Sequence, residues 1–268
     1  MEQLNGIVTQ VIEVSPIMKV FRIAPDGWEL PDFKAGQFVA LFLPASAKKV
    51  AEATADYEDF PPDKLIKRAY SIASSSKSKE FLEFYITLVH SGALTPRLFN
   101  LKIGDRVGVG QKFVGMFTID RIDLEKNVVL IATGTGVAPY MSMLRTDALN
   151  RKGKIAVIHG AANSWDLGYS SELQLLQNFA SQFTYIPTIT EPQKELTPWQ
   201  GQKAFIQDMW KAGIMEEKWG FKPTPDDTHV FLCGNPRMIA DMSEALETDG
   251  FTEWSRKNPD GQIHIEKF

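Results

Sequence analysis

The feature that most constrains the fold is an apolar run that ends in a glycine-containing turn. Val128-Val129-Leu130-Ile131-Ala132 holds no polar residue, which is typical of a strand buried on both faces of a parallel sheet. Thr133-Gly134-Thr135-Gly136-Val137-Ala138-Pro139 follows directly. Glycines let a backbone approach a phosphate closely, and a helix N-terminus offers unpaired N–H groups to its charge. The pattern predicts the strand–turn–helix unit of a nucleotide-binding sheet, although spacing alone also allows a tight turn without a ligand.

The rest of the chain after Lys126 continues this alternation of strands and helices. We expect further strands at Ile155–Ile158, Thr184–Ile186, His229–Leu232 and Ile263–Ile265. We expect helices at Tyr140–Asn150, Ser170–Ala180, Ala204–Ala212 and Pro236–Glu247. Strands that alternate with helices in this way predict a Rossmann-like, doubly wound parallel sheet.

The first 118 residues have a different pattern, in which short β-branched and aromatic segments are separated by turn signals. The predicted strands are Ile7–Val14, Val20–Ile23, Gln37–Leu43, Phe81–Val89 and Arg106–Val109. Regularly spaced short strands favour an antiparallel β-barrel or sandwich. The Ala- and Glu-rich stretch Ala45–Lys67 interrupts the pattern and is interpreted as a surface insertion.

The polar stretch Asp120–Lys126 separates the two patterns and is the predicted domain boundary. We therefore expect a β domain at residues 1–119 and an α/β domain at residues 120–268. The charge changes near the same place, because residues 1–118 have a net charge of +1 and residues 119–268 a net charge of −5, which together give −4.

Composition excludes several classes of protein. A net charge of −4 argues against a nucleic-acid-binding protein, which needs cations to offset phosphates. The longest apolar stretches, such as Phe38–Leu43, are far shorter than the roughly 18 to 20 residues of a membrane span. The N-terminus lacks the pattern of a signal peptide. Cys233 is the only cysteine, so there is no internal disulfide, cysteine-ligated zinc site or plant-type iron–sulfur cluster. We expect a cytoplasmic monomer without a metal or membrane partner.

Two further motifs carry residues suited to binding a cofactor. Phe231-Leu232-Cys233-Gly234-Asn235-Pro236 leads from a strand end into a helix, and strand ends of this kind line the ligand crevice of a parallel sheet. Arg68-Ala69-Tyr70-Ser71 combines a phosphate fork, an aromatic plane and a hydroxyl. Each motif alone also fits a structural role, as an inert buried cysteine or a surface arginine beside a core tyrosine.

Taken in order along the chain, these motifs resemble the ferredoxin–NADP⁺ reductase family, in its bacterial ferredoxin (flavodoxin) reductase branch. The matching segments are Arg68-Ala69-Tyr70-Ser71, Tyr85-Ile86-Thr87, Gly92-Ala93-Leu94-Thr95, the turn at Gly134–Pro139, Cys233-Gly234-Asn235-Pro236 and Glu266-Lys267-Phe268. The resemblance implies an FAD-binding barrel and an NAD(P)-binding domain. It implies electron transfer between NAD(P)H and a small ferredoxin- or flavodoxin-like protein. An oxygenase reductase component and a flavin-free binding module of the same fold are the alternatives.

The resemblance also implies roles for individual residues. Arg68 and the backbone of Ala93-Leu94-Thr95 would hold the FAD pyrophosphate, and Tyr70 would pack on the isoalloxazine. The catalytic set would be Ser71 at the reactive flavin nitrogen, Cys233 near the nicotinamide, Glu266 near the flavin, and Phe268 as an aromatic cap. The other implied FAD contacts are Ala69, Tyr85, Ile86, Thr87, Gly92 and Thr135. The other implied dinucleotide contacts are Gly134, Gly136, Val137, Pro139, Gly234, Asn235 and Pro236.

Hydride transfer between flavin and nicotinamide requires no general base, because the cofactors carry the chemistry. The scattered histidines are interpreted as structural for this reason and because none has an evident catalytic partner. They are His90, His159, His229 and His264.

The sequence departs from the NADPH-using relatives at three positions where they carry arginines that grip the 2′-phosphate. This chain has Ala162, Glu191 and Gln202 there. An acidic side chain would repel a 2′-phosphate but accept hydrogen bonds from a ribose diol. We expect a preference for NADH, although Lys194 and Lys203 lie close enough in sequence to compensate.

The net negative charge disfavours a strongly acidic electron carrier, but the insertion carries four lysines that could still attract one. Lys48, Lys49, Lys64 and Lys67 would form a local basic patch able to steer such a partner.

Overall fold

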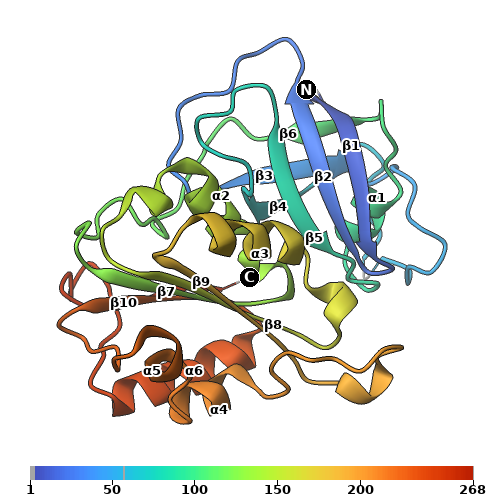
Figure 1. Cartoon of the computed structure of the whole chain (residues 1–268). Helices are drawn as coiled ribbons and strands as arrows, with labels where there is room; N and C mark the ends of the chain where they lie inside the picture. The colour runs from blue at the N-terminus through green and yellow to red at the C-terminus, as the bar shows by residue number, and fades with distance from the viewer. Residues whose placement is uncertain (1–3, 57, 268) are drawn as a thin grey trace. The chain divides into compact units, whose positions relative to one another are not determined.

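The computed structural model describes residues 4–56 and 58–267, which form two compact units (Figure 1). The first unit ends at Thr118 and also takes in Ala138–Thr146, and the second comprises Ile119–Val137 and the chain from Asp147 onward. Helix α2 (Ala138–Thr146) belongs to the first unit because Ser142 donates a hydrogen bond to the carbonyl of Ser74, at 2.7 Å, and Arg145 pairs with Glu83. The domain boundary predicted from the sequence, between residues 119 and 120, instead places α2 in the second domain. That boundary stays a prediction.

The first unit contains one antiparallel sheet in the order β4-β3-β6-β1-β2-β5. Its strands are β1 (Gly6–Ser15), β2 (Met18–Pro25), β3 (Phe38–Pro44), β4 (Leu65–Ser71), β5 (Leu82–Thr87) and β6 (Arg106–Val109). After β4, the amide of Ala73 donates to the carbonyl of Glu83 in β5, at 2.8 Å. This bond joins the two ends of the strand order, and a hydrophobic core lies inside. The predicted antiparallel barrel class is confirmed.

Two features of the first unit were not predicted. Strand β4 begins at Leu65, so the last three residues of the expected insertion Ala45–Lys67 are strand, paired with β3. Its burial does not alternate cleanly, because Lys67, Arg68 and Ala69 are all exposed. The short helix α1 (Thr95–Phe99) has Pro96 in its first turn.

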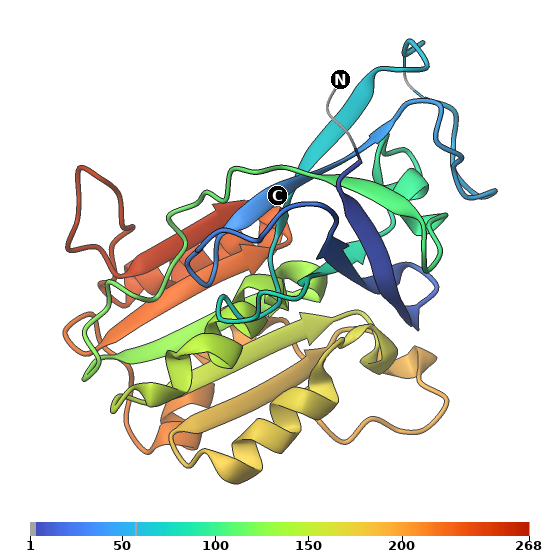
Figure 2. The same cartoon turned by 90° about the horizontal axis from the view of Figure 1, so that it is seen from above.

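The second unit contains a five-stranded parallel sheet in the order β11-β10-β7-β8-β9. Its strands are β7 (Asn127–Thr133), β8 (Ile155–Ala161), β9 (Phe183–Ile189), β10 (Thr228–Gly234) and β11 (Ile263–Lys267). Figure 2 shows them side by side, from the red β11 at one edge to the amber β9 at the other. Val128–Ala132 in β7 is fully buried, as expected for a strand covered on both faces. The predicted parallel sheet is confirmed.

Helices cover this sheet on both faces. Helix α3 (Ser170–Phe179) lies on one face, and α4 (Ile206–Lys211), α5 (Ile214–Trp219) and α6 (Pro236–Thr248) lie on the other (Figure 1). The core on the second side includes Trp210, Met242 and Leu246. Short 3-10 helices occupy Gly134–Val137, Ala148–Asn150, Ser164–Asp166 and Pro192–Lys194.

Two predicted helices end early. The helix expected at Tyr140–Asn150 ends at Thr146, and a separate 3-10 turn follows Asp147. The helix expected at Ala204–Ala212 is the shorter α4, which begins at Ile206, and Gly213, with a φ of 81°, separates it from the unpredicted α5. Left-handed backbone of this kind is favoured only by glycine and breaks a right-handed helix. Within the described ranges, no helix combines the length and hydropathy needed to cross a bilayer.

Three histidines lie inside the second unit. Burial lowers the pKa of His159 from 6.5 to about 4. His229 and His264 face each other with Nδ1 and Nε2 3.1 Å apart. Burial first, and then nearby cations, lower their pKa values to about 4 and about 3. All three rings are therefore neutral in the folded protein at neutral pH, in agreement with structural roles.

These shifts predict acid sensitivity. The unfolded chain binds protons at these histidines near pH 6.5, whereas the folded chain does so only near pH 4 or below, so stability falls as the pH drops through this window. Between pH 7.5 and 5.5, we expect a loss of about 1 kcal/mol for each fully buried histidine. Urea unfolding at the two pH values measures it. His159→Asn should reduce the loss, because it removes one of the histidines whose pKa is lowered by burial. A stability that is equal at both pH values would contradict the prediction.

Candidate functional site

The carboxyl ends of β7 and β10 meet at the centre of the parallel sheet. From β7 the chain proceeds to β8 and β9 on one side, whereas β10 and β11 lie on the other. Ligands of open α/β sheets bind at such a reversal of strand order. The hydroxyl of Thr133 accepts a hydrogen bond from the amide of Asn235, at 2.7 Å. This bond ties the two predicted turns together.

Two glycines permit this close approach. A Cβ at Gly136 would lie 2.5 Å from the carbonyl oxygen of Cys233. Gly234 has a φ of 125°, and its Cβ would lie 2.4 Å from the Thr133 hydroxyl oxygen. Any larger residue would force the strand ends apart, so the backbone approach explains both glycines before any ligand is considered.

The residues around the glycines have identifiable structural partners. Nε2 of His159 lies 3.0 Å from the carbonyl of Gly134, which makes Nε2 the protonated nitrogen. Asn235 caps α6 by accepting a hydrogen bond from the amide of Arg237, at 2.8 Å, and Pro236 occupies the first turn. The predicted strand–turn–helix units are confirmed at both turns. Thr135 is half-buried, Val137 is buried, and Pro139 lies in the first turn of α2.

Cys233 points into the protein interior. Its side chain is fully buried, and burial, assisted by the charge of Glu266, raises the pKa of the thiol well above its usual range. Cys233 pairs in register with Glu266, which is half-buried in β11. The thiol is therefore protonated at neutral pH and is not a nucleophile. Phe268, the predicted aromatic cap, lies outside the described residues.

The three positions linked to a 2′-phosphate lie together in the second unit. The amide of Glu191 donates to the carbonyl of Ala162 at 2.9 Å, and the amide of Ile189 donates to the carbonyl of Gln202 at 3.1 Å. Glu191 also pairs with Lys194, at 2.7 Å. Residues 40 positions apart in sequence thus meet where β8 and β9 end. Lys194, one of the two lysines expected to compensate for the missing arginines, is therefore paired with Glu191.

In the first unit, the Arg68-Ala69-Tyr70-Ser71 motif forms the end of the edge strand β4. Arg68 and Tyr70 share one side of the strand, since they are two residues apart. Arg68 is exposed and donates to the carbonyl of Lys67 at 2.7 Å. Tyr70 is half-buried, and burial raises the pKa of its phenol. Ser71 is buried, whereas Ala69 is exposed.

Strand β5 presents alternate residues to opposite sides. Ile86 belongs to the hydrophobic core with Leu82 and Phe84, so Tyr85 and Thr87 lie on the other side. The Tyr85 hydroxyl donates to the sulfur of Met18, at 3.1 Å. Ile86 can therefore contribute to a ligand site on that side only through its backbone.

The loop from Val89 to Thr95 offers hydrogen-bond donors. The Thr95 hydroxyl accepts from the amide of Val89, at 3.0 Å, and donates to its carbonyl, at 3.2 Å. Gly92 donates to the carbonyl of Val89, at 2.8 Å. Among the residues that the structure describes, no acceptor pairs with the amides of Ala93, Leu94 and Thr95. Consecutive unpaired amides are a donor set that suits phosphate oxygens.

Sequence reasoning missed two arginine–carboxylate groups of the first unit. Arg97 is 3% exposed and binds Asp56 through both Nη atoms, at 3.1 and 2.7 Å. Its hydrogen bonds hold the pKa of Asp56 at about 2. Glu83 is 1% exposed and lies between Arg22, at 2.7 Å, and Arg145, at 2.6 Å. The detectable signal was a charged residue inside otherwise apolar segments, at Glu83 in β5 and Arg97 in α1.

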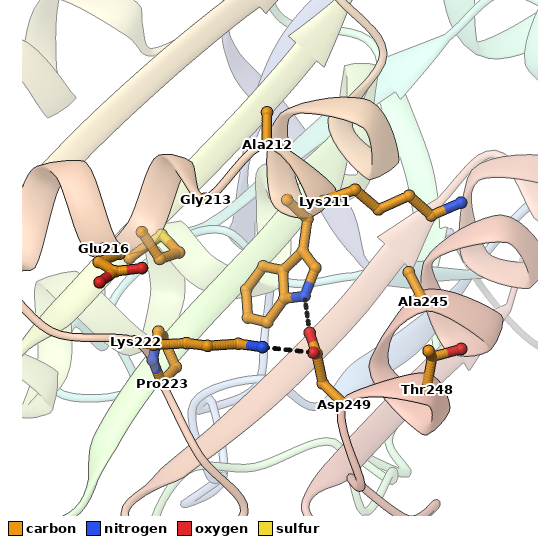
Figure 3. Close-up of a pocket in the computed structure, with 11 residues that line it drawn as sticks. Lys211, Ala212, Gly213, Glu216, Lys222, Pro223, Ala245, Thr248 and Asp249 are labelled. Carbon is orange, nitrogen blue, oxygen red and sulfur yellow. Dashed lines mark hydrogen bonds and ion pairs between the residues drawn. The ribbon is translucent and has the colours of Figure 1, made fainter.

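A pocket of about 450 Å³ lies where α4, α5 and the end of α6 meet (Figure 3). At its wall, Asp249 accepts from Lys222, at 2.6 Å, and from the Trp210 indole, at 2.9 Å. The 13 residues of α6 separate this end from the strand ends by about 20 Å. None of the predicted site residues lines it. In the described part of the chain, no cluster of His, Cys, Asp or Glu could hold a metal ion.

Comparison with known proteins identifies relatives over nearly the whole chain. Residues 130–244 match the oxidoreductase NAD-binding domain family. The flavodoxin/ferredoxin–NADP reductase of Buchnera aphidicola is 32% identical over 90% of both chains. The ferredoxin–NADP reductase of Pseudomonas aeruginosa is 30% identical over 88% of this chain and 86% of its own.

Solved structures agree with these sequence matches. A ferredoxin NADP⁺ reductase from Neisseria gonorrhoeae, with bound FAD and NADP, has a TM-score of 0.81 at 25% identity and covers 98% of this chain and 97% of its own. A cytochrome P450 reductase from Amycolatopsis has a TM-score of 0.75 at 25% identity, with 98% of this chain and 69% of its own covered. The chain therefore belongs to the ferredoxin/flavodoxin–NADP reductase family, among its bacterial-type members.

Proposed function

We propose that this protein is an FAD-dependent oxidoreductase that moves electrons between NAD(P)H and a ferredoxin or flavodoxin. The observation that carries the proposal is the match over 90% of both chains to a flavodoxin/ferredoxin–NADP reductase. Both units take part in this match, so the chain contains the two parts that such a reaction requires. FAD, when bound, accepts hydride from the nicotinamide and releases the electrons singly.

The donor set of the first unit fits FAD. The unpaired amides of Ala93, Leu94 and Thr95 would bind the pyrophosphate, together with the exposed fork of Arg68. Tyr70 would lie against the flavin ring, and the Ser71 hydroxyl would face its reactive nitrogen. Tyr85 and Thr87 would line the same site from β5, with Ala69, Ile86 and Gly92 contributing backbone.

The turns of the second unit would hold the nicotinamide dinucleotide. Gly136 and Gly234 keep the strand ends close, and Gly134, Val137, Pro139, Asn235 and Pro236 shape the turns. Thr135 would contact the adenosine half of FAD. Cys233 would lie at the nicotinamide end of this site. Its buried, protonated thiol would contribute packing there and would not act as a base. Glu266 would supply a charge near the flavin.

Proton transfer by a histidine is not part of this proposal. The ring of His159 is held between the carbonyl of Gly134, at 3.0 Å, and the hydroxyl of Tyr185, at 3.4 Å. His229 and His264 are occupied with each other. Hydride transfer needs positioned cofactors rather than a general base.

We also propose NADH as the preferred donor. None of the three positions Ala162, Glu191 and Gln202 is an arginine, and Lys194 is engaged by Glu191 at 2.7 Å. A second carboxylate, Glu195, accepts hydrogen bonds from the amide and hydroxyl of Ser164, at 2.7 and 2.6 Å. A dianionic 2′-phosphate would be repelled by the carboxylates of Glu191 and Glu195 there.

Two of the four lysines of the expected basic patch are paired with carboxylates. Lys49 pairs with Asp56, at 3.0 Å, and Lys64 pairs with Glu58, at 3.3 Å. These carboxylates lie in the same segment and cancel much of its positive charge. An oxygenase component as acceptor would share the same NAD(P)H half-reaction.

Anaerobic reduction of the bound flavin tests both the function and the donor. We expect NADH to bleach the flavin absorbance, with a catalytic efficiency at least equal to that of NADPH. Each charge-assisted phosphate contact contributes roughly 1.5 to 3 kcal/mol. Loss of the three arginines should therefore weaken NADPH binding by more than the roughly 1.4 kcal/mol that corresponds to a tenfold change in affinity. Glu191→Arg should improve NADPH use, and Glu191→Gln should improve it less. A more than tenfold advantage for NADPH in the unmodified protein would overturn the donor assignment, and a protein without bound flavin would overturn the function.

Arg68→Ala should weaken FAD binding by roughly 1.5 to 3 kcal/mol, the usual contribution of a charge-assisted hydrogen bond. Lys67→Ala is the matched control, because Lys67 is the next residue on β4 but lies over the Phe42 ring on the other side of the strand. Equilibrium titration with FAD measures both variants. Equal affinity of the Arg68→Ala variant and the unmodified protein would remove Arg68 from the site.

Deletion of Phe268 should tighten dinucleotide binding and slow product release. The prediction rests on the resemblance of the segment Glu266-Lys267-Phe268 to the family and on the proposed role of Phe268 as a flavin cap. Removing the ring also removes an aromatic contact of about 0.5 to 1.5 kcal/mol. Stopped-flow measurement of the NAD⁺ dissociation constant checks this prediction, and an unchanged constant would contradict a capping role.

A further inference from the structure

The segment between β3 and β4, residues 45–64, is hydrogen-bonded to both ends of the loop that carries Gly92–Thr95. At the start of the loop, the amide and the hydroxyl of Thr54 both donate to the carbonyl of His90, at 3.0 and 3.1 Å. At its end, the amide of Val50 donates to the carbonyl of Pro96, at 3.1 Å. The segment is therefore built into the loop's conformation rather than being a loose surface insertion.

Arg97 makes a third connection, at the middle of the loop. All five of its N–H donors are used, because Nε and Nη2 bind the carbonyl of Ala45, Nη1 binds the carbonyl of Ala93, and both Nη atoms bind Asp56. The bond to Ala93 measures 2.5 Å. A guanidinium remains charged at all relevant pH values and holds its partners in a fixed planar geometry.

The bond to Ala93 orients the peptide that would face the ligand. In a trans peptide, the carbonyl of Ala93 and the amide of Leu94 point in opposite directions. Arg97 holds the carbonyl on its own side, so the amide of Leu94 is directed to the other side, where it has no acceptor among the described residues. The arginine thus sets the direction of one of the three unpaired amides.

Asp56 keeps Arg97 in this position. Its carboxylate is charged at neutral pH, since the hydrogen bonds of Arg97 and Lys49 hold its pKa at about 2. Without Asp56, a 3% exposed guanidinium would lack its counter-charge. A buried charge that loses its partner moves toward water, and that movement would release the carbonyl of Ala93.

We propose that Asp56 and Arg97 are positioning residues that hold the Gly92–Thr95 loop ready for the pyrophosphate of FAD. The segment of residues 45–64 thereby makes the first unit selective for a flavin dinucleotide over a flavin mononucleotide, which has no pyrophosphate bridge. This inference rests on the proposed function, because it requires that the loop binds the FAD pyrophosphate. Preorganised donors favour a ligand by removing the cost of ordering the loop.

The test compares the affinities for FAD and FMN of the flavin-depleted full-length protein, titrated by flavin fluorescence. Asp56→Asn should raise the FAD dissociation constant about tenfold, as expected when preorganisation of charged contacts is lost, and should leave that of FMN almost unchanged. Asp56→Glu should restore part of the FAD affinity. Glu58→Gln is the matched control, because it breaks only the Lys64–Glu58 pair of the same segment.

A purely structural role predicts a different result, in which the affinities for FAD and FMN fall together. That outcome, or an unchanged ratio of the two affinities in Asp56→Asn, would overturn the inference. If Asp56→Asn does not fold, Lys49→Gln replaces it, since it removes the second counter-charge of Asp56, at 3.0 Å, together with the hydrogen bond of Lys49 to the carbonyl of Thr54, at 2.7 Å. The ratio of FAD affinity to FMN affinity should then fall less than in Asp56→Asn. An unchanged ratio would again overturn the inference. Failure of the unmodified protein to bind any flavin would instead refute the proposed function.

Discussion

The close approach of two strand ends governs the second unit. The carbonyl of Cys233 occupies the space that a side chain at Gly136 would need, and Thr133 occupies the space beside Gly234. A parallel sheet whose order reverses at β7 and β10 brings these ends together whether or not a ligand is present. The glycines are thus explained by the backbone alone. The assignment of this unit to dinucleotide binding comes instead from its match to the oxidoreductase NAD-binding domain family, because the spacing of the glycines alone also fits a turn without a ligand.

The sequence was most informative where burial imposes a simple pattern. Val128–Ala132 is apolar throughout because helices or loops cover both faces of β7, and such runs predict the parallel strands well. Strand β4 was harder to predict, because an edge strand whose Lys67, Arg68 and Ala69 are all exposed lacks a clean alternation. Helix α5 depends on the left-handed conformation of Gly213, which leaves only a weak trace in sequence. Likewise, nothing local to Asp56 indicates that it meets Arg97, 41 residues later.

Parallel pairing also explains how distant residues form one electrostatic environment. Ala162 follows β8, Glu191 follows β9, and Gln202 is hydrogen-bonded back to Ile189 at the end of β9. The resemblance identified these positions one at a time, and the structure adds their proximity. It also adds the Lys194–Glu191 pair, which sequence could not reveal because a lysine three residues away is equally able to face a ligand. The electrostatic potential at this corner therefore depends on all the residues that the fold brings together, and not on any one of them.

The two buried arginine–carboxylate groups of the first unit have the same arrangement, in which an arginine binds a backbone carbonyl and a carboxylate. Arg97 holds the carbonyl of Ala93, and Arg145 holds the carbonyl of Ala73, at 2.9 Å, while each pairs with a carboxylate. Burying such pairs costs desolvation free energy that their attraction roughly offsets, so they contribute little net stability. Their geometric effect is large, because a planar guanidinium fixes several acceptors at once. A lysine at position 97 would keep the charge but could not hold Asp56, Ala45 and Ala93 in one plane. Arginine is therefore required at this position for orienting the backbone, independently of stability.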